Sequence, residues 1–238
     1  EIERFDALAR VWWDPDGPMK PLHALNPIRL AYLRQRIDTH FSTDPKGLKP
    51  LVGKRVVDIG CGGGLVSEPL ARLGGTVTGI DAAAKNIEVA RLHGQEQGLA
   101  IDYRVTTAED LAASDERFDM VVALEIIEHV TDPEAFVKSC RDLMTPGGLL
   151  VMSTLNRTPK AWLMAIAGAE YVMRWLPRGT HQWKKFIRPS ELATMVRAAE
   201  LIMDHQQGLV FNPVSWSWAL SARDLDVNYM VSAHRPAK

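Results

Sequence analysis

The hydrophobic residues in the centre of the chain follow two alternating periods. Between residues 55 and 155, short apolar runs typical of buried strands alternate with longer stretches whose apolar positions recur at helical spacing. Residues 120–124 are apolar throughout, as expected of a strand buried on both faces in the middle of a parallel sheet. This alternation predicts a doubly wound α/β fold of Rossmann-like type.

Two later segments, 203–213 and 226–235, also have strand-like composition, and in the second Val227, Tyr229 and Val231 share one face. They complete an expected seven-stranded, mostly parallel sheet flanked by helices. The apolar segment 216–220 between them is assigned no role.

Amphipathic patterns before the first strand predict two N-terminal helices. The first covers residues 1–13, and the second begins with Asn26 as N-cap and Pro27 at the first helical position. We expect both to form a lid or flank. Arg29, near the start of the second helix, has two interpretations: it contacts an acidic group such as a cofactor carboxylate, or it is a solvated surface residue.

A nearly continuous apolar segment at residues 161–176 interrupts the alternation after the fifth strand. It is too short to span a bilayer, so it fits either a helix lying in the membrane interface or a cap over an apolar substrate pocket. A further helix is expected with Ser190 as N-cap and Glu191 in its first turn. The predicted parts of this single domain are the lid at 1–38, the core at 54–156, the insertion at 157–189 and the C-terminal part at 190–238.

The stretch VVDIGCGGG at residues 56–64 predicts a strand, a tight turn and the start of a helix. Glycines such as Gly60 and Gly62 allow positive φ and the close approach of a ligand. The dinucleotide pattern G-x-G-x-x-G fails here, because its third glycine would fall on Leu65 or Ser67. Asp58 at the strand end also suits the cationic S-adenosylmethionine better than a pyrophosphate.

Acidic residues follow the next strands. Asp81 lies about twenty residues beyond the loop, where a carboxylate can accept hydrogen bonds from ribose hydroxyls. Glu109 follows the third strand, where it can accept from the adenine amine or serve only as a helix-terminal charge. Glu125, Glu128 and His129 follow the fourth strand, at the edge where ligands collect in such folds.

Composition narrows the class of partner. The net charge of -1 gives no electrostatic argument for a nucleic-acid partner. Two cysteines are too few for a disulfide framework, no apolar run is long enough to span a membrane, and no leader-like segment opens the chain. We therefore expect a cytoplasmic enzyme with a small-molecule substrate, in peripheral contact with the inner face of the inner membrane if residues 161–176 touch lipid.

Several motifs together resemble the ubiquinone-pathway O-methyltransferases (UbiG type). The resemblance rests on WWD, NPIRL, VVDIGCGGG, LEIIEHV, GTHQWKKFI and DVNYM, which are spread over nearly the whole chain. It implies O-methylation of 2-polyprenyl-6-hydroxyphenol and 3-demethylubiquinol with S-adenosylmethionine, and association with other enzymes of that pathway. By position it implies cofactor contacts from Arg29, Gly60, Asp81 and Leu124. The chemistry described above makes Asp58, Gly62 and Glu109 further candidates for cofactor contacts.

The resemblance further implies Mg²⁺ at Glu125, Glu128 and His129, where it would lower the pKa of a catechol hydroxyl. In a site without metal, His129 or His181 is the candidate general base, because imidazole titrates near neutrality. Three other functions stay open: methylation of another small phenolic or quinone acceptor, a non-catalytic lipid-binding scaffold on the same fold, and, least favoured, an NAD-dependent oxidoreductase.

Overall fold

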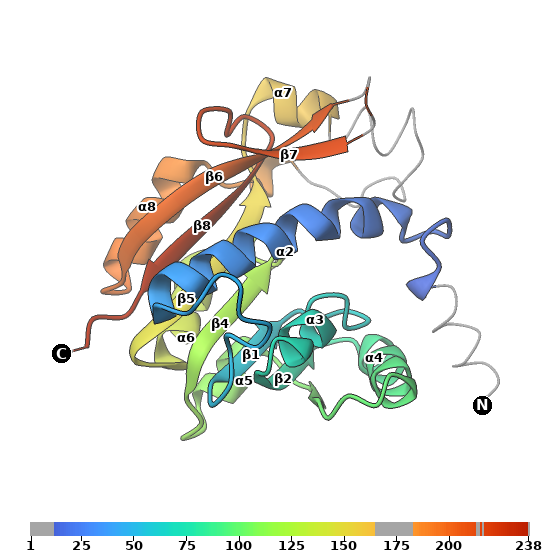
Figure 1. The fold of residues 1–238 in the computed structure, drawn as a ribbon. Helices are drawn as coiled ribbons and strands as arrows, with labels where there is room; N and C mark the ends of the chain where they lie inside the picture. The colour runs from blue at the N-terminus through green and yellow to red at the C-terminus, as the bar shows by residue number, and fades with distance from the viewer. Residues whose placement is uncertain (1–11, 165–182, 213–214, 216, 238) are drawn as a thin grey trace.

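The structure, a computed structural model, describes residues 12–164, 183–212, 215 and 217–237. Strands and helices alternate from the first strand to the fifth (Figure 1). In chain order the elements are α2 (Lys20–Phe41), β1 (Arg55–Ile59), α3 (Ser67–Arg72), β2 (Thr76–Asp81), α4 (Ala84–Glu96), β3 (Asp102–Val105), α5 (Ala108–Ala112), β4 (Phe118–Leu124), α6 (Pro133–Asp142), β5 (Met144–Leu155), α7 (Pro159–Ala161), η2 (Trp183–Lys185), α8 (Pro189–Ala198), β6 (Ile202–Asn212), β7 (Ser217–Ser221) and β8 (Asn228–His234).

The strands form one sheet in the order β3-β2-β1-β4-β5-β8-β6-β7. The pairs among β1 to β5 are parallel, and β8, β6 and β7 join in antiparallel fashion. Because the strand order reverses between β1 and β4, the loops after these two strands border the crevice where ligands bind in open α/β sheets. The predicted doubly wound fold is confirmed.

The sheet has one strand more than the seven we expected. The additional strand is β7, which pairs with β6 from Gly208 opposite Ser221 to Asn212 opposite Ser217. It comes from the apolar segment that had no predicted role. Its aromatic residue Trp218 lies 5.2 Å from Phe211, centroid to centroid, so packing with the neighbouring strand accounts for its apolar character.

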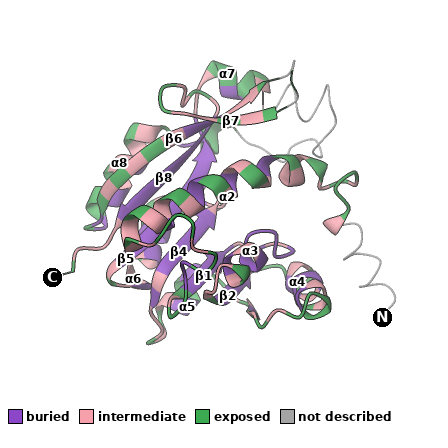
Figure 2. Ribbon diagram, in the orientation of Figure 1, coloured by how far each residue is buried: buried purple, intermediate pink, exposed green. Residues whose placement is uncertain are grey.

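Each face of the sheet is covered by helices (Figure 2). On one face, α2 and α3 bury apolar side chains against β1, β2, β4, β5 and β8. On the other face, α5, α6 and α8 pack against the opposite sides of the same central strands. This double burial explains why the central strands are apolar at consecutive positions.

Helix α2 differs from its predicted start. It begins at Lys20, with Pro21 in the first turn, and runs through Pro27. The prediction of Asn26 as N-cap was therefore wrong, because Pro21 already supplies the residue that suits a first turn, where no N–H bond is needed. The Asn26 side chain instead donates from Nδ2 to the carbonyl of Leu65, at 2.8 Å, and so ties α2 to the glycine-rich segment.

Helix α8 begins two residues earlier than predicted. Its N-cap is Arg188 rather than Ser190, and Pro189 takes the first helical position. Glu191 lies in the first turn as expected, and its Oε2 accepts from the Arg188 backbone N–H at 2.9 Å. The Glu191 carboxylate therefore caps the start of the helix, so no hydrogen bond from the Ser190 side chain is needed there.

Parts of two expected segments lie outside the described residues: residues 1–11 of the first helix and residues 165–176 of the apolar segment. His181 also lies outside them. The described part of the insertion contains α7, in which Thr158 accepts from the Ala161 backbone N–H. Among the helices of the described ranges, none has the length and apolar character needed to cross a membrane.

Candidate functional site

The glycine loop at residues 60–64 connects β1 to the segment before α3. Gly60, Gly62 and Gly64 have φ of 69°, 55° and 92°, a backbone conformation that side chains disfavour. A Cβ on Gly60 would also lie 2.0 Å from Cδ1 of Ile126. The predicted need for glycine at positions 60 and 62 is therefore a property of the observed turn.

Asp81 at the end of β2 fixes the loop. Its Oδ2 accepts from the Gly62 backbone N–H at 3.0 Å, and its Oδ1 accepts from Ala83 N–H at 2.8 Å and Asn86 Nδ2 at 3.2 Å. The Asp81 side chain is half-buried, at the carboxyl end of its strand. It thus lies where a ligand in the crevice would meet it, and its proposed contact with ribose stays a prediction.

Asp58 lies inside β1, one residue before the strand ends, and is 3 % exposed. Its Oδ2 accepts from Ser67 Oγ at 2.6 Å. Burial, with the nearby charge of Asp81, raises the pKa of Asp58 to about 7. This carboxyl group is therefore buried within β1 and not at an open end of the strand. A cation bound near it would favour its charged form.

Arg29 reaches the same edge of the sheet from α2. It is 6 % exposed and forms an ion pair with Glu125, directly after β4. The interpretation of Arg29 as a solvated surface residue was wrong. Its Nε is buried and finds no acceptor among the described residues, so the guanidinium retains an unused donor.

Glu125 is held in an unusual backbone conformation. Its φ is 54°, which non-glycine residues seldom adopt and which is common at functional sites. Its Oε1 also accepts from Asn228 Nδ2, at 2.9 Å, at the start of β8. Helix α2, the loop after β4 and strand β8 are thereby joined in one polar cluster: Arg29, Glu125 and Asn228.

Glu128 is directed to different partners. It is 4 % exposed, and its Oε2 accepts from Thr154 Oγ1 of β5 at 2.8 Å. Burial, with the charge of Glu125, raises the pKa of Glu128 to about 8. His129, the next residue, has an exposed side chain.

The predicted magnesium ligands do not form a ligand set in this arrangement. Across residues 12–164, 183–212, 215 and 217–237, no three His, Cys, Asp or Glu side chains lie so that they could hold one ion. Glu125 is occupied by Arg29 and Asn228, whereas Glu128 is bonded to Thr154. Mg²⁺ demands near-octahedral geometry with its carboxylate ligands directed at one point, so the residues as placed do not fit the ion.

The remaining predicted cofactor residues lie along the same edge. Leu124, the last residue of β4, is partly buried against the core on the α2 side. Glu109 is exposed in the first turn of α5, while its neighbour Asp110 caps the turn with Thr107. Glu109 is thus left unused by the cap, and its proposed contact with adenine stays a prediction.

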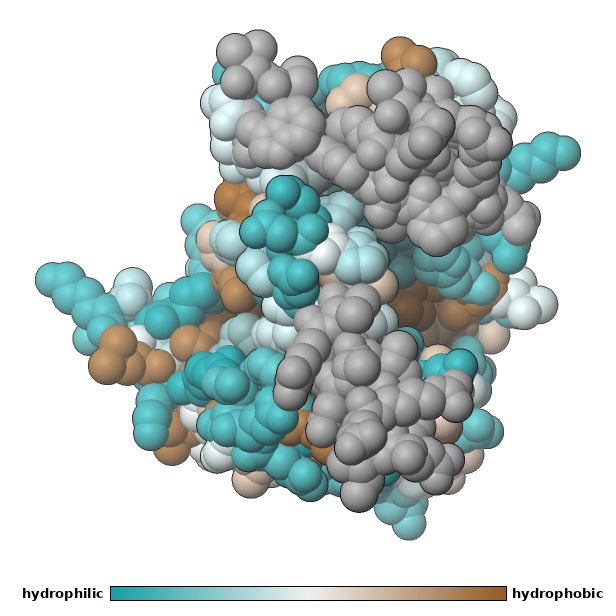
Figure 3. Space-filling view, turned by 90° about the vertical axis from the view of Figure 1, so that its right-hand side faces the viewer, coloured by the Kyte–Doolittle hydropathy of each residue, from teal (hydrophilic) through white to brown (hydrophobic). Residues whose placement is uncertain are grey.

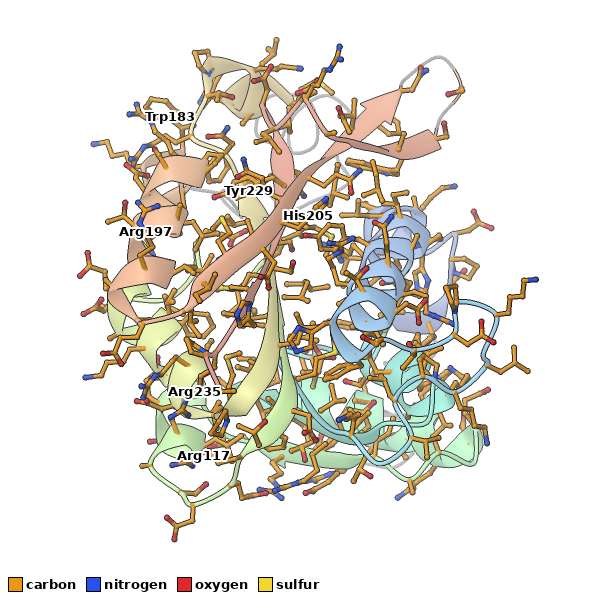
Figure 4. The ribbon with its side chains drawn as sticks, turned by 60° about the vertical axis from the view of Figure 1, so that its left-hand side comes forward. Arg117, Trp183, Arg197, His205, Tyr229 and Arg235 are labelled. Atoms are coloured by element: carbon orange, nitrogen blue, oxygen red, sulfur yellow. The ribbon has the colours of Figure 1, made fainter. Side chains whose placement is uncertain are left out.

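A cavity of about 740 Å³ adjoins Glu128 on the α6 and α8 side of the sheet. Apolar side chains of Ile127, Val130 and Met195 line it together with the basic Lys184 and Lys185. Nearby, the Tyr229 hydroxyl donates to the carbonyl of Ile187 at 2.9 Å, on the side of β8 that faces α8 (Figure 4). On the face seen in Figure 3, hydrophobic side chains also gather in a hollow between hydrophilic ones.

Sequence reasoning did not find Ser67, Thr154 and Asn228. All three are common residue types, and each acquires its role only by pairing with an acidic residue outside its own helix or strand. DVNYM was available as a signal, since Asn228 is its central residue, but spacing alone gives that residue no partner.

Comparison with known proteins places this site in a family. The methyltransferase domain family matches residues 57–152. The ubiquinone biosynthesis O-methyltransferase of Cereibacter sphaeroides is 57% identical over 99% of this chain and 96% of its own length. That of Dinoroseobacter shibae is 53% identical over 100% of this chain and 96% of its own.

Solved structures support the fold. Magnesium protoporphyrin IX methyltransferase from Synechocystis, solved with bound SAM, has a TM-score of 0.62 and 17% identity, and the match covers 97% of this chain and 90% of that one. The N-methyltransferase NodS from Bradyrhizobium japonicum, in complex with S-adenosyl-L-homocysteine, has a TM-score of 0.58 and 17% identity, with 98% of each chain covered. The fold is that of the class I methyltransferases, and by its full-length relatives the chain belongs to the ubiquinone biosynthesis O-methyltransferase family.

Proposed function

We propose that the chain transfers the methyl group of S-adenosylmethionine to a phenolic oxygen of two polyprenylated acceptors, 2-polyprenyl-6-hydroxyphenol and 3-demethylubiquinol. The observation that carries the proposal is the extent of the family match. The ubiquinone biosynthesis O-methyltransferase of Cereibacter sphaeroides matches 99% of the chain. The match therefore includes the residues around the cavity beside Glu128 as well as the glycine loop.

The donor would lie over the glycine loop at the carboxyl ends of β1, β2 and β4. Glycine backbone at positions 60 and 62 permits close approach, and Asp81 can accept from the ribose hydroxyls. The unused Nε of the buried Arg29 suits the donor's carboxylate. The residues proposed to contact the donor are Arg29, Asp58, Gly60, Gly62, Asp81, Glu109 and Leu124.

The reaction is a displacement at carbon. The acceptor oxygen forms a bond to the methyl carbon while the carbon–sulfur bond breaks, and the sulfonium becomes the neutral sulfur of S-adenosylhomocysteine. The phenolic proton must pass to a base, and holding the two reacting atoms in line supplies much of the rate.

Glu128 is our first candidate for that base. It borders the cavity of about 740 Å³, and a carboxyl group with a pKa of about 8 takes up a phenolic proton more readily than one with an ordinary pKa. His129 and His181, the bases expected from sequence, stay proposals: the first has an exposed side chain, and the second lies outside the described residues.

Magnesium stays a prediction from the resemblance and enters no step above. For Glu125, Glu128 and His129 to share an ion, Glu125 would have to leave Arg29 and Asn228, and Glu128 would have to leave Thr154. Its test is whether chelation by EDTA lowers methyl transfer and whether added Mg²⁺ restores it.

The experiment for the proposed function is transfer of a labelled methyl group to a short-chain demethylubiquinol, with the product located by mass spectrometry and NMR. We expect label on the phenolic oxygen, and a loss of turnover of roughly a hundredfold in Glu128→Gln at neutral pH, since one general base contributes about that much or more. Label on carbon would indicate methylation of another quinone position, and donor binding without transfer to any acceptor would indicate a scaffold. Either result would refute the proposal.

We also propose peripheral membrane contact through residues 161–176, because Trp162 is 48% exposed and the proposed acceptors carry prenyl chains. Co-sedimentation with liposomes of the protein and of Trp162→Asp tests this contact. Equal binding by both forms would show that the segment only caps the pocket.

A further inference from the structure

The N-terminal WWD motif lies directly on the glycine loop. The Trp12 indole occupies the space above two glycines, so that a Cβ on Gly62 would lie 2.8 Å from Trp12 Cζ2 and one on Gly63 would lie 2.2 Å from Trp12 Nε1. Only a residue without a side chain fits under this ring at position 63. The short segment before α2 therefore forms a wall of the loop that the proposed function assigns to the methyl donor.

Several contacts hold this segment in place. Trp13 Nε1 donates to the carbonyl of Gly63 at 3.0 Å, and the Trp13 ring stacks on His93 of α4 with centroids 3.6 Å apart and an interplanar angle of 8°. His93 is in turn bonded to the fully buried Glu68 of α3. On the other side, the His23 ring lies 3.0 Å from the Trp12 carbonyl oxygen. Trp12 is thus anchored through its backbone and its neighbour.

Within the described ranges, the Trp12 indole itself has an unpaired hydrogen-bond donor. Its Nε1–H is buried and has no acceptor among the described residues, although it lies against the backbone of the loop. A buried N–H normally finds a partner, because leaving it unpaired costs free energy. The neighbouring Trp13 indole donates its N–H to the Gly63 carbonyl, so of these two indole N–H groups it is that of Trp12 which lacks an acceptor among the described residues.

We propose that Trp12 is a donor-binding residue: its ring covers the glycine loop, and its Nε1–H donates to an oxygen of the bound adenosyl donor. This inference rests on the proposed function and extends it, since neither the glycine pattern nor the acidic residues of the core include the N-terminal segment. Trp13 and His93 act through Trp12 as positioning residues.

The test is the affinity for S-adenosylhomocysteine, measured by calorimetry on the full chain. Trp12→Phe keeps an aromatic ring and removes the Nε1–H donor together with the five-membered ring that carries it. We expect the Kd to rise about fivefold to tenfold, as for the loss of one hydrogen bond, while the Tm changes little. The matched control is Trp218→Phe, which alters a ring on the edge strand β7, far from the loop after β1, and leaves the Kd as it is. An unchanged Kd in Trp12→Phe would overturn the proposal.

A second experiment does not depend on the Phe variant. Gly63→Ala places a methyl group against the Trp12 ring, so it should displace the ring and weaken binding by a factor similar to that of Trp12→Ala. When both changes are combined, the methyl group meets no ring, and the second change should add nothing to the first. Additive effects would mean that the added methyl group acts on the ligand itself, which would contradict the placement of the Trp12 ring over Gly63. An unchanged Kd in Trp12→Ala would contradict a role for Trp12 in binding.

The wild-type titration separates this inference from the proposed function. If the wild-type chain does not bind S-adenosylhomocysteine, the proposed function fails and Trp12 has no ligand to hold. If wild type and Trp12→Phe bind it equally, only the role of Trp12 fails.

Discussion

The acidic residues that follow β4 are held in place by ion pairs and hydrogen bonds with side chains of other elements. Arg29 from α2 meets Glu125 after β4, Asn228 of β8 donates to the same Glu125, and Thr154 of β5 donates to Glu128. Two neighbouring acidic residues thereby receive different environments: one is held as an ion pair, and the other has a pKa of about 8. Their roles in the reaction can differ for that reason.

Gly60 is the residue whose replacement tests the loop most simply. Gly60→Ala adds a Cβ 2.0 Å from Ile126 at a φ of 69°, so we expect affinity for S-adenosylhomocysteine to fall by roughly tenfold or more. The matched control is Gly98→Ala, at a φ of 66° with no atom within 4 Å of the new Cβ, which should cost stability but not affinity. Equal losses of affinity in the two variants would contradict the role of the loop.

The pKa of Asp58 predicts a pH dependence of stability. Since burial raises this carboxyl pKa from 3.8 to about 7, the folded state holds the proton more tightly than the unfolded state. The resulting stability is complete below about pH 4 and is lost as the pH rises through about 7. In Asp58→Asn, we expect the free energy of unfolding to decline less between about pH 4 and about pH 8, by about 1–4 kcal/mol, in denaturant titrations. Parallel curves for the two proteins would show that Asp58 is already ionised.

At this scale the sequence predicts the residues whose role follows from local spacing. Gly60 and Gly62 were recognisable because the tight turn between a strand and a helix requires glycine, and Asp81 was recognisable because it ends the next strand. Asn228 and Thr154 were not, because their partners lie 103 and 26 residues away, and only the sheet order brings them together.

Among the elements, α2 is the one whose character differs most from expectation. It was expected as a lid or flank, yet it buries Tyr32, Leu33 and Ile37 in the main core on one face of the sheet. The Tyr32 hydroxyl lies 3.2 Å from His205 Nδ1 of β6, and Figure 4 shows His205 on the side of the sheet toward α2. Burial raises the pKa of Tyr32 to about 12, so this hydroxyl remains protonated. Helix α2 is therefore a fixed part of the core that delivers Arg29.

This position predicts that α2 contributes to global stability. Leu33→Ala, at a side chain that is 1% exposed, should lower the free energy of unfolding by about 2–5 kcal/mol through the cavity it leaves. Leu48→Ala is the control, because Leu48 is 84% exposed and its truncation should change stability by less than about 0.5 kcal/mol. A loss confined to donor affinity, with normal stability in Leu33→Ala, would instead indicate a detachable lid.

The predicted starts of α2 and α8 were wrong for a common reason. In both, a proline occupies the first turn ahead of the polar residue chosen as N-cap, and that polar residue bonds elsewhere or is not needed. Capping rules identify residues that can end a helix, but several such residues compete within a few positions, and tertiary contacts such as Asn26 to Leu65 decide among them.

For the whole molecule, the alternation of strand and helix predicted the architecture because each parallel strand must be followed by a covering helix. Strand β7, the one strand beyond the seven predicted, was not predicted because it is an edge strand that pairs with β6 alone among the described strands. Figure 1 shows that α2 crosses one face of the sheet. Because β1, β2 and β4 are adjacent and parallel, the loops that follow them lie at the same edge. Family membership accounts for the chemistry that this arrangement serves.

A crystal structure of the protein with S-adenosylhomocysteine would show whether the glycine loop holds the methyl donor. We predict that the ligand lies over residues 60–64, with its ribose hydroxyls within hydrogen-bond distance of Asp81 and its carboxylate near Arg29. A ligand bound elsewhere, or no ligand at this loop under saturating conditions, would contradict the proposed binding site.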